Sequence, residues 1–218
     1  MLTASNLKKS YGALNVLKGV DLKIESEEVL SIVGASGAGK STLLHILGTL
    51  DLADQGSLLI DNTEISKLST HQLATFRNQR IGFIFQFHNL LPEFTALENV
   101  CLPGFIGGKP EKAVRSRAHE LLGSLGMSGR IDHKPSELSG GEQQRVAVAR
   151  ALINDPSIIF ADEPSGNLDS KNAAELHNLF FQLRDEFHKT FVIVTHNHEL
   201  AEMSDRKVEI ADGIILSA

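Results

Sequence analysis

The chain has 218 residues, of which 42% are hydrophobic and 22% charged, so it can bury a sizeable core without a metal or disulfide staple. Cys101 is the only cysteine and the formal charge is −6, which excludes a disulfide-built secreted scaffold and disfavours a general nucleic-acid binder. No apolar run reaches the ~20 residues of a bilayer span and the start of the chain has no signal-peptide core, so we expect neither a membrane-spanning nor an exported protein.

In chain order, the pattern alternates between strands and helices. Residues 2–7 and 20–24 alternate apolar and polar side chains, as half-exposed antiparallel edge strands do. Residues 41–50 read as a helix, and residues 207–216 read as a hairpin around Asp212-Gly213. Nearly continuous apolar runs, typical of strands covered on both faces of a parallel sheet, occur at 29–33, 81–85, 158–161 and 191–195. The sequence therefore predicts an α/β fold.

A helical region interrupts this alternation between residues 88 and 156. Strand patterns are scarce there, and the apolar side chains of one helix face repeat at helical spacing, namely Val114, Ala118, Leu121, Leu122 and Leu125. No linker rich in Gly or Ser separates the region. We therefore predict a single domain, with a core over about 1–87 and 157–218 and a helical subdomain over about 88–156.

A glycine-rich phosphate cradle follows the strand at 29–33. Its residues fit the pattern G-x-x-x-x-G-K-[ST], namely Gly34, Ala35, Ser36, Gly37, Ala38, Gly39, Lys40 and Ser41. Glycines let successive N–H groups point inward, and the next helix adds the positive end of its dipole. Lys40 is expected to reach the β and γ phosphates, Ser41 to offer its hydroxyl to Mg²⁺, and Thr42 to contact the α phosphate. The alternative is a glycine-rich turn that merely links the strand to the helix, and we disfavour it because the full pattern should arise by chance in only about 1% of chains of this length.

Two acids, Asp162 and Glu163, end the apolar run at 158–161. Ligands of open α/β sheets bind at the carboxyl ends of strands. By analogy with the second acidic motif of P-loop ATPases, Asp162 is expected to hold Mg²⁺ and Glu163 to polarise an attacking water as general base. Acids before a proline are also ordinary loop material, and only the phosphate cradle tips the balance toward function.

A second candidate phosphate site lies in the segment LSGGEQQR, residues 138–145. Ser139 and Glu142 have the spacing of a helix capping box, which is the local structural reading. That reading does not explain Gly140 and Gly141 in the first helical turn, where glycine costs stability. A helix start free of side chains presents bare N–H groups to an anion. Two phosphate sites far apart in sequence imply either an internal fold-back or two chains that clasp one nucleotide.

LSGGEQQR resembles the signature motif of ABC ATPases, and with GASGAGKST and IIFADEP the match covers almost the whole chain in the family's order. The resemblance implies a P-loop NTPase (RecA-like) core with a mostly parallel sheet, an antiparallel β edge subdomain and a helical signature subdomain. It also implies ATP and Mg²⁺ as ligands. By position, Tyr11 matches the aromatic that stacks on adenine, Gln86 the glutamine that approaches Mg²⁺ and the attacking water, and His196 the histidine at the γ phosphate. Residues 165–169 match the D-loop, although the lipoprotein-releasing group of this family commonly has threonine where Ser165 stands.

The same resemblance implies how the chain assembles. In an ATP-dependent, head-to-tail homodimer, the signature residues of one subunit, Ser139, Gly140, Gly141 and Glu142, would close on the ATP bound by the other. His196 and His198 also allow a zinc site, but no third ligand stands nearby in sequence, so we disfavour it. A P-loop kinase or GTPase is disfavoured too, because neither needs LSGGEQQR.

Within the family, residues 85–92 and 95–100 are similar to the group that contains the lipoprotein-releasing (LolD-like) ATPases, the MacB ATPase domain and FtsE. The resemblance to the lipoprotein-releasing members extends through residues 14–22, 106–109, 135–137 and 166–169. That likeness implies ATP-driven lipoprotein release through two integral membrane subunits of the LolC/LolE kind. The chain would then lie at the cytoplasmic face of the inner membrane, with no nucleic acid and no direct contact with the transported substrate. FtsE-like regulation of cell-wall hydrolysis and MacB-like efflux stay open as alternatives.

Overall fold

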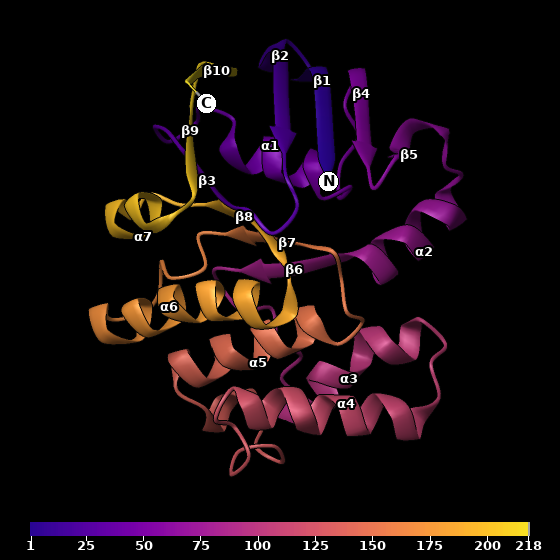
Figure 1. The fold of residues 1–218 in the computed structure, drawn as a ribbon, viewed down its shortest axis with the longest axis vertical. Coiled ribbons are helices and arrows are strands. Elements are labelled where there is room, and N and C mark those ends of the chain that lie inside the picture. The colour runs from indigo at the N-terminus through magenta and orange to yellow at the C-terminus, as the bar shows by residue number, and fades with distance from the viewer. Residues whose placement is uncertain (218) are drawn as a thin grey trace. The chain divides into compact units, whose positions relative to one another are not determined.

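Figure 1 shows the computed structural model, which describes residues 1–217. The chain forms two compact units: Met1–Ala74 together with the chain from Leu183 onward, and Thr75–Gln182. The first unit contains β1 (Leu2–Tyr11), β2 (Leu14–Ile24), β3 (Val29–Val33), α1 (Lys40–Leu47), β4 (Gln55–Ile60), β5 (Thr63–Glu64), η1 (Ile65–Lys67), β8 (Thr190–Val194), α7 (His198–Met203), β9 (Arg206–Ala211) and β10 (Ile214–Ser217). The predicted boundaries of one domain with a helical subdomain over 88–156 stay a prediction.

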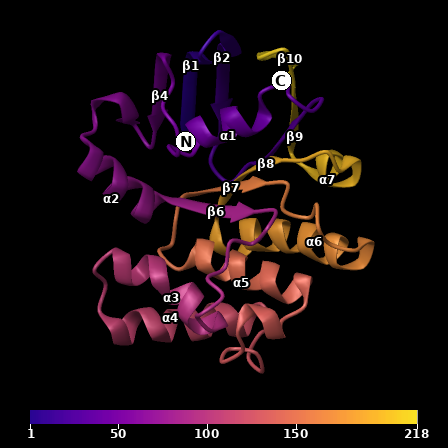
Figure 2. The ribbon, with the colours of Figure 1, turned by 180° about the vertical axis from the view of Figure 1, so that it is seen from behind.

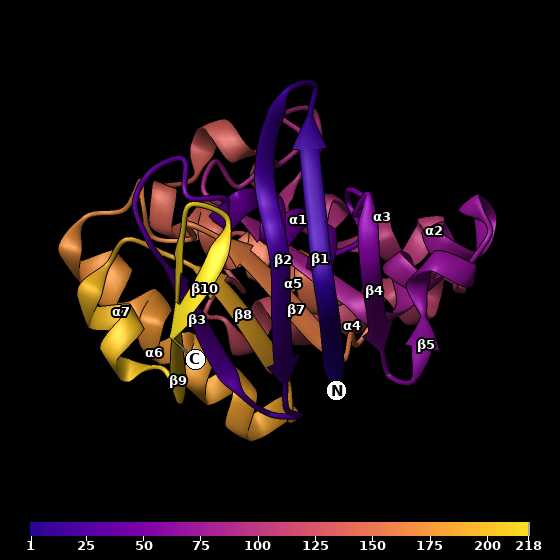
Figure 3. The ribbon, with the colours of Figure 1, turned by 90° about the horizontal axis from the view of Figure 1, so that it is seen from above.

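An antiparallel sheet in the order β2-β1-β4-β5 forms one part of the first unit. Figure 3 shows β2, β1 and β4 side by side, and Leu2 pairs with Ile24 on one side and with Ile60 on the other. Alternate side chains are buried on either side of an irregularity at Ser5–Asn6 in β1, which is the period-2 pattern of a strand with one covered face. The predicted antiparallel subdomain is therefore present as a sheet of its own.

Parallel strands make up the other part of the first unit, in the order β10-β9-β3-β8. β3 runs parallel to both β8 and β9, and β10 returns antiparallel to β9 as the predicted hairpin. All five residues of β8 are buried, and so are the first four of β3, which is why both read as continuous apolar runs. β3 thus leads into the glycine-rich loop from a fully covered sheet position.

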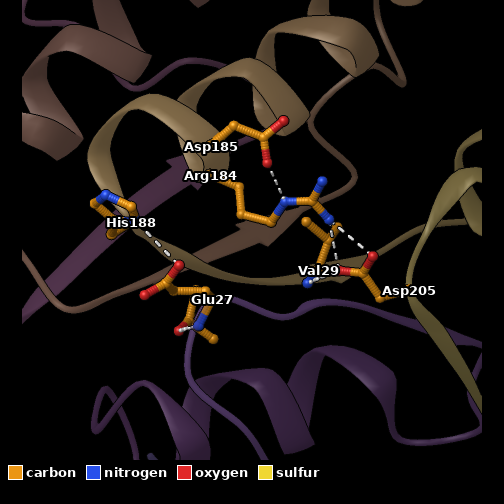
Figure 4. Close-up of polar contacts among 7 residues, drawn as sticks. Glu27, Val29, Arg184, Asp185, His188 and Asp205 are labelled. Carbon is orange, nitrogen blue, oxygen red and sulfur yellow. Dashed lines mark hydrogen bonds and ion pairs between the residues drawn. The ribbon is translucent and has the colours of Figure 1, made fainter.

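Polar contacts anchor the start of β3, as Figure 4 shows. One carboxylate oxygen of Asp205 accepts a hydrogen bond from the Val29 N–H at 2.8 Å, and both accept from Nη1 of Arg184 at 2.8 Å. Nearby, the Glu27 N–H donates to the Thr190 hydroxyl at 2.9 Å. These bonds hold the first residues of the strand that precedes the glycine-rich loop.

The second unit contains β6 (Ile81–Phe85), α3 (Ala96–Ile106), α4 (Glu111–Ser124), η2 (Pro135–Glu137), α5 (Gly140–Leu152) and β7 (Ile158–Asp162). The unit boundaries fall inside α2 (Thr70–Arg80) and α6 (Ser170–Phe187). β6 and β7 pair in parallel, as Figure 2 shows. None of the helices within residues 1–217 combines the length and apolarity that a membrane span requires.

Three helices of the second unit, α3, α4 and α5, pack against one another (Figure 1). The apolar face predicted from helical spacing is confirmed, since Val114 and its four partners are all buried. Gly104 allows α3 to approach α4, because a Cβ there would lie 2.7 Å from Cγ1 of Val114. The buried side-chain amide of Asn99 accepts a hydrogen bond from the Leu91 N–H at 2.8 Å, and so pairs a backbone group of the loop before α3.

The predicted helix at 41–50 begins one residue earlier, at Lys40, and ends three residues earlier, at Leu47. Gly48 is its C-cap, and Thr49 has φ +62°, which a helix cannot continue through. β4, β5 and α2 were not predicted. α2 buries none of its residues, so it lacks the apolar stripe by which a helix is recognised in sequence.

Candidate nucleotide-binding site

The glycine-rich loop of the first unit joins β3 to α1. Gly37 and Gly39 have φ values of +79° and +103°, in the left-handed region that favours glycine. At Gly34 a Cβ would lie 2.1 Å from the carbonyl oxygen of Ile210, so no other residue fits against β9. The glycines predicted to shape a phosphate cradle are thus required by the backbone and its packing.

The lysine of the loop folds back over it. Nζ of Lys40 donates hydrogen bonds to the carbonyl oxygens of Gly34 at 2.8 Å and Ala35 at 2.9 Å. Behind the loop, the Ala38 carbonyl accepts from the Gly213 N–H of the β9–β10 turn at 3.1 Å. The loop is therefore held between its own lysine and a hairpin of the same unit.

Helix α1 begins directly at this lysine, and its N-cap, Gly39, supplies no side-chain cap. The N–H groups of a first helical turn have no intrahelical acceptor, and together with the helix dipole they favour an anion. Ser41 and Thr42 lie in that first turn, as predicted. The loop and the helix start together suit a polyphosphate.

Two other predicted residues belong to the first unit. Tyr11 ends β1 with 51% of its surface exposed, and its hydroxyl donates to Oδ2 of Asp51 at 2.6 Å. His196 follows β8 and is exposed, just before Asn197 caps α7 by accepting from the Leu200 N–H. Residues 1–217 contain no group of three or more His, Cys, Asp or Glu side chains suited to a metal, which leaves the zinc alternative unsupported.

The second unit brings the predicted catalytic residues to the ends of two adjacent strands. Phe85 of β6 lies opposite Asp162 of β7, so Gln86 and Glu163 each follow at the carboxyl end of neighbouring strands. Glu163 adopts φ +46°, a left-handed conformation that is costly for a residue with a long side chain. Such strain at the end of a buried strand is typical of a functional position.

The D-loop fixes the position of Gln86. Nε2 of Gln86 donates to Oδ1 of Asn167 at 3.2 Å, and Nδ2 of Asn167 donates back to the Gln86 carbonyl at 3.1 Å. Gly166 makes room for this exchange, because a Cβ there would lie 2.8 Å from Nε2 of Gln86. Gln86 and the D-loop are therefore joined by a reciprocal pair of hydrogen bonds within the second unit.

The signature segment forms the capping box at the start of α5. The Ser139 N–H donates to Oε2 of Glu142 at 2.8 Å, and the Ser139 hydroxyl accepts from the Glu142 N–H at 3.3 Å. Hydrogen bonds from the backbone and hydroxyl of Ser139, with the charge of Arg130, lower the pKa of Glu142. The predicted capping box of Ser139 and Glu142 is therefore confirmed.

The two glycines of the signature segment differ in the space around them. Gly141 is buried, and a Cβ there would lie 2.6 Å from Oδ1 of Asn172 on α6. Gly140 is exposed, and its Cβ would make only an ordinary 3.6 Å contact with Leu168. Packing within the unit thus explains Gly141 but not Gly140, which leaves bare backbone at the helix start.

Several residues around these sites were missed in the sequence. Buried His177 of α6 contacts the Ser165 hydroxyl of the D-loop through Nε2 at 3.0 Å. Arg150 of α5 donates to the carbonyl oxygens of both His88 and Asn89 at 2.6 Å. In the sequence, the only sign of His177 and Arg150 is a polar side chain among the apolar residues of a helix. That sign does not identify the group that each side chain contacts.

Comparisons with known proteins agree with this geometry. The ABC transporter family model matches residues 17–166. The lipoprotein-releasing system ATP-binding protein LolD of Cytophaga hutchinsonii is 62% identical over 99% of each chain, and the protein of the same name from Bacteroides fragilis is 58% identical over 99% of this chain and 100% of its own.

Two solved structures extend the likeness to the fold. A dimeric ATP-binding cassette in a post-hydrolysis state, bound to ADP and Pi, has a TM-score of 0.91 and 41% identity over 100% of this chain and 97% of its own. The cbiO1 protein of Clostridium perfringens, part of the cbiONQ complex, has a TM-score of 0.90 and 28% identity over 99% of this chain and 86% of its own. The predicted P-loop NTPase fold with its antiparallel and helical subdomains is confirmed.

Proposed function

The chain belongs to the ABC transporter ATP-binding family, and from this premise we propose that it is the ATP-hydrolysing subunit of a lipoprotein-releasing system. The observation that carries the proposal is the 62% identity to a protein named LolD over 99% of both chains. The reaction is hydrolysis of ATP to ADP and phosphate, coupled to transport.

The first unit binds the nucleotide in this proposal. The inward N–H groups of the loop and the start of α1 receive the phosphates, with Lys40 at the β and γ phosphates and Thr42 at the α phosphate. Lys40 already contacts loop carbonyls through Nζ, so binding requires it to exchange those bonds for phosphate oxygens. Tyr11 offers a half-exposed ring for the adenine, and His196 contacts the γ phosphate.

The second unit supplies the hydrolytic groups. Glu163 takes the proton of the attacking water, and Gln86, held by Asn167, orients that water. The hydroxyl of Ser41, the amide of Gln86 and the carboxylate of Asp162 each carry an oxygen of the kind that Mg²⁺ prefers, so each would be a ligand for it, with water completing its coordination. When bound, Mg²⁺ neutralises the charge that develops on the phosphate oxygens.

The signature segment acts in a dimer. Ser139, Gly141 and Glu142 form the start of α5, and exposed Gly140 leaves its backbone accessible to a phosphate group. We assign this helix start to the nucleotide of a second copy, in an ATP-dependent homodimer. The dimeric cassette with ADP and Pi supports this assignment.

Membrane partners dock on the segment after Gln86. Three large apolar side chains are exposed there: 73% of Phe87, 43% of Leu91 and 38% of Phe94. Exposed apolar side chains in sequence beside a catalytic residue fit a partner that senses the ATPase cycle. The partners are two integral membrane subunits of the LolC/LolE kind, which place this chain at the cytoplasmic face of the inner membrane without contact with the lipoprotein.

The ATPase roles are tested by Glu163→Gln. A neutral isostere cannot accept the proton, so we expect ATP affinity to be kept, ATP to trap a dimer in size-exclusion chromatography, and phosphate release to fall at least 100-fold. Glu186→Gln, an exposed acid on α6, is the matched control. Unchanged turnover with bound ATP would exclude Glu163 as the base.

The transport role needs a separate assay. The chain is reconstituted with LolC/LolE-like subunits in lipoprotein-loaded vesicles, and lipoprotein release is measured with ATP. Release that depends on ATP and is lost in Glu163→Gln supports the proposal. ATP hydrolysis without any release would refute lipoprotein release while leaving the ATPase activity intact.

A further inference from the structure

A polar chain leads from the hydroxyl of Tyr11 into the fold of the first unit. The hydroxyl donates to Oδ2 of Asp51 at 2.6 Å, and Oδ1 of Asp51 accepts from Nζ of Lys9 at 2.8 Å. The Tyr11 hydroxyl is therefore tied, through Asp51, to the turn that follows α1.

Lys9 is unusual because its position is almost fully buried, with 11% of the side chain exposed. Besides Asp51, its Nζ donates to the Leu52 carbonyl at 2.7 Å and lies 3.8 Å from Oδ1 of Asp54. The same Nζ lies 5.2 Å from the centroid of the Tyr11 ring, within cation–π distance. One ammonium thus holds both the carboxylate and the ring.

Asp51 is itself fixed relative to the phosphate loop. Its N–H and that of Leu50 donate to the His45 carbonyl of α1, at 3.2 and 2.8 Å. Its Oδ1 also accepts from the Leu52 N–H at 2.7 Å. Because α1 begins at Lys40, a carboxylate placed at its far end relates the Tyr11 ring to the phosphate site by a rigid element.

We propose that Asp51 and Lys9 are positioning residues, which hold the Tyr11 ring in the orientation that receives the base of the nucleotide. This inference rests on the proposed function in one respect, the role of Tyr11 as the adenine platform. A phenol ring anchored at its hydroxyl by Asp51 and on one face by Lys9 keeps its remaining exposed surface in one orientation, so less rotamer freedom is lost when a base stacks on it.

The chain provides its own spectroscopic probe, because Tyr11 is the only tyrosine and there is no tryptophan. The hydrogen bond with Asp51, followed by burial, raises the pKa of the Tyr11 hydroxyl above its ordinary value. Absorbance at 295 nm during a pH titration therefore reports the ionisation of this one hydroxyl. We expect Asp51→Asn to move the midpoint to lower pH, and the exposed-site control Asp21→Asn to leave it unchanged.

Binding is measured by calorimetry with two probes, ATP and inorganic tripolyphosphate. We expect Tyr11→Ala to weaken ATP about tenfold or more, the usual cost of a lost base–aromatic stack. Asp51→Asn and Tyr11→Phe should each weaken ATP binding about three- to fivefold. Their combination should weaken it no further, because both substitutions act on the same Tyr11–Asp51 hydrogen bond. Tripolyphosphate, which has no base, should bind all variants equally.

The outcomes separate the inference from its premise. Additive losses in the double variant, or an Asp51→Asn affinity equal to that of Asp21→Asn, would overturn the positioning role. Equal weakening of tripolyphosphate would assign Asp51 to the fold of the phosphate loop instead. Unchanged ATP affinity in Tyr11→Ala would refute the adenine platform itself, and with it the positioning role, even where the titration midpoint still shifts.

Discussion

Arg150 of α5 holds the segment that follows Gln86, and its replacement by methionine is the sharpest test of the second unit. Nη1 donates to the Asn89 carbonyl and Nη2 to the His88 carbonyl, both at 2.6 Å. His88 and Asn89 have φ values of +60° and +50°, so two successive non-glycine residues are left-handed. Burial and the Arg150 charge lower the pKa of His88, which favours its neutral form.

The expected cost can be worked from these contacts. Two hydrogen bonds from a charged donor contribute about 1.5–3 kcal/mol each, or about 3–6 kcal/mol together. Relaxation of two left-handed residues recovers about 1 kcal/mol each, and Arg150→Met no longer has to desolvate a guanidinium. We therefore expect a net loss of about 2 kcal/mol in the free energy of unfolding.

Urea unfolding followed by far-UV circular dichroism measures this loss. Arg145→Met is the matched control on the same helix, because Arg145 makes one bond to Glu175 between partly exposed side chains. That exposed pair should contribute about 0.2–1 kcal/mol. If Arg150→Met costs no more than Arg145→Met, the two carbonyl contacts do not hold the segment. We also expect Arg150→Met to reduce stimulation of the ATPase by membrane subunits, since Phe87 and Leu91 lose their fixed placement.

Two further predictions concern the signature helix. Gly141→Ala should destabilise the protein by about 1–3 kcal/mol in the same urea assay, because its Cβ would overlap Asn172, whereas Gly140→Ala should be neutral or stabilising by up to about 1 kcal/mol; equal effects would refute the packing argument. The folded-state pKa of Glu142 is lowered by Ser139, so its stabilisation is present above its ordinary value of 4.5 and is lost as pH falls through the folded value. Glu142→Ala should therefore lower stability at pH 7 by about 1 kcal/mol, and the difference should shrink below pH 4.5; a pH-independent difference would contradict the capping role.

The strands of the fold were predictable because their signal is local. β3, β6, β7 and β8 are short apolar runs that burial on both faces demands, and the hairpin has its turn residues in place. α2 escaped because it buries no side chain, so no periodicity distinguishes it from a loop. The early end of α1 depends on the backbone of Thr49, a residue type that rarely adopts positive φ.

The candidate site was predictable in its motif residues and not in their supports. Glycine spacing and a lysine identify a phosphate loop because the chemistry needs those residues at that spacing. The supports come from distant parts of the chain: Asp51 lies 40 residues from Tyr11, and Asn167 lies 81 from Gln86. In the sequence every acid or amide is an equal candidate for these two supports, so only the folded chain identifies the partners.

Backbone strain occurs both at Glu163, where we propose the general base, and in the segment after Gln86, where we propose that partners dock. Glu163 directly follows β7, and His88 and Asn89 lie three and four residues after β6, all with positive φ. Glycine would adopt these angles at lower cost, but the general base that we propose at Glu163 needs a carboxylate, so there the strain must be kept. At Asn89 the side chain is not needed for the Arg150 contact, which uses the carbonyl. The strained conformation at Glu163 is therefore the cost of keeping its carboxylate. At His88 and Asn89, where the backbone carbonyls make the contact, the guanidinium of Arg150 stabilises the strained conformation.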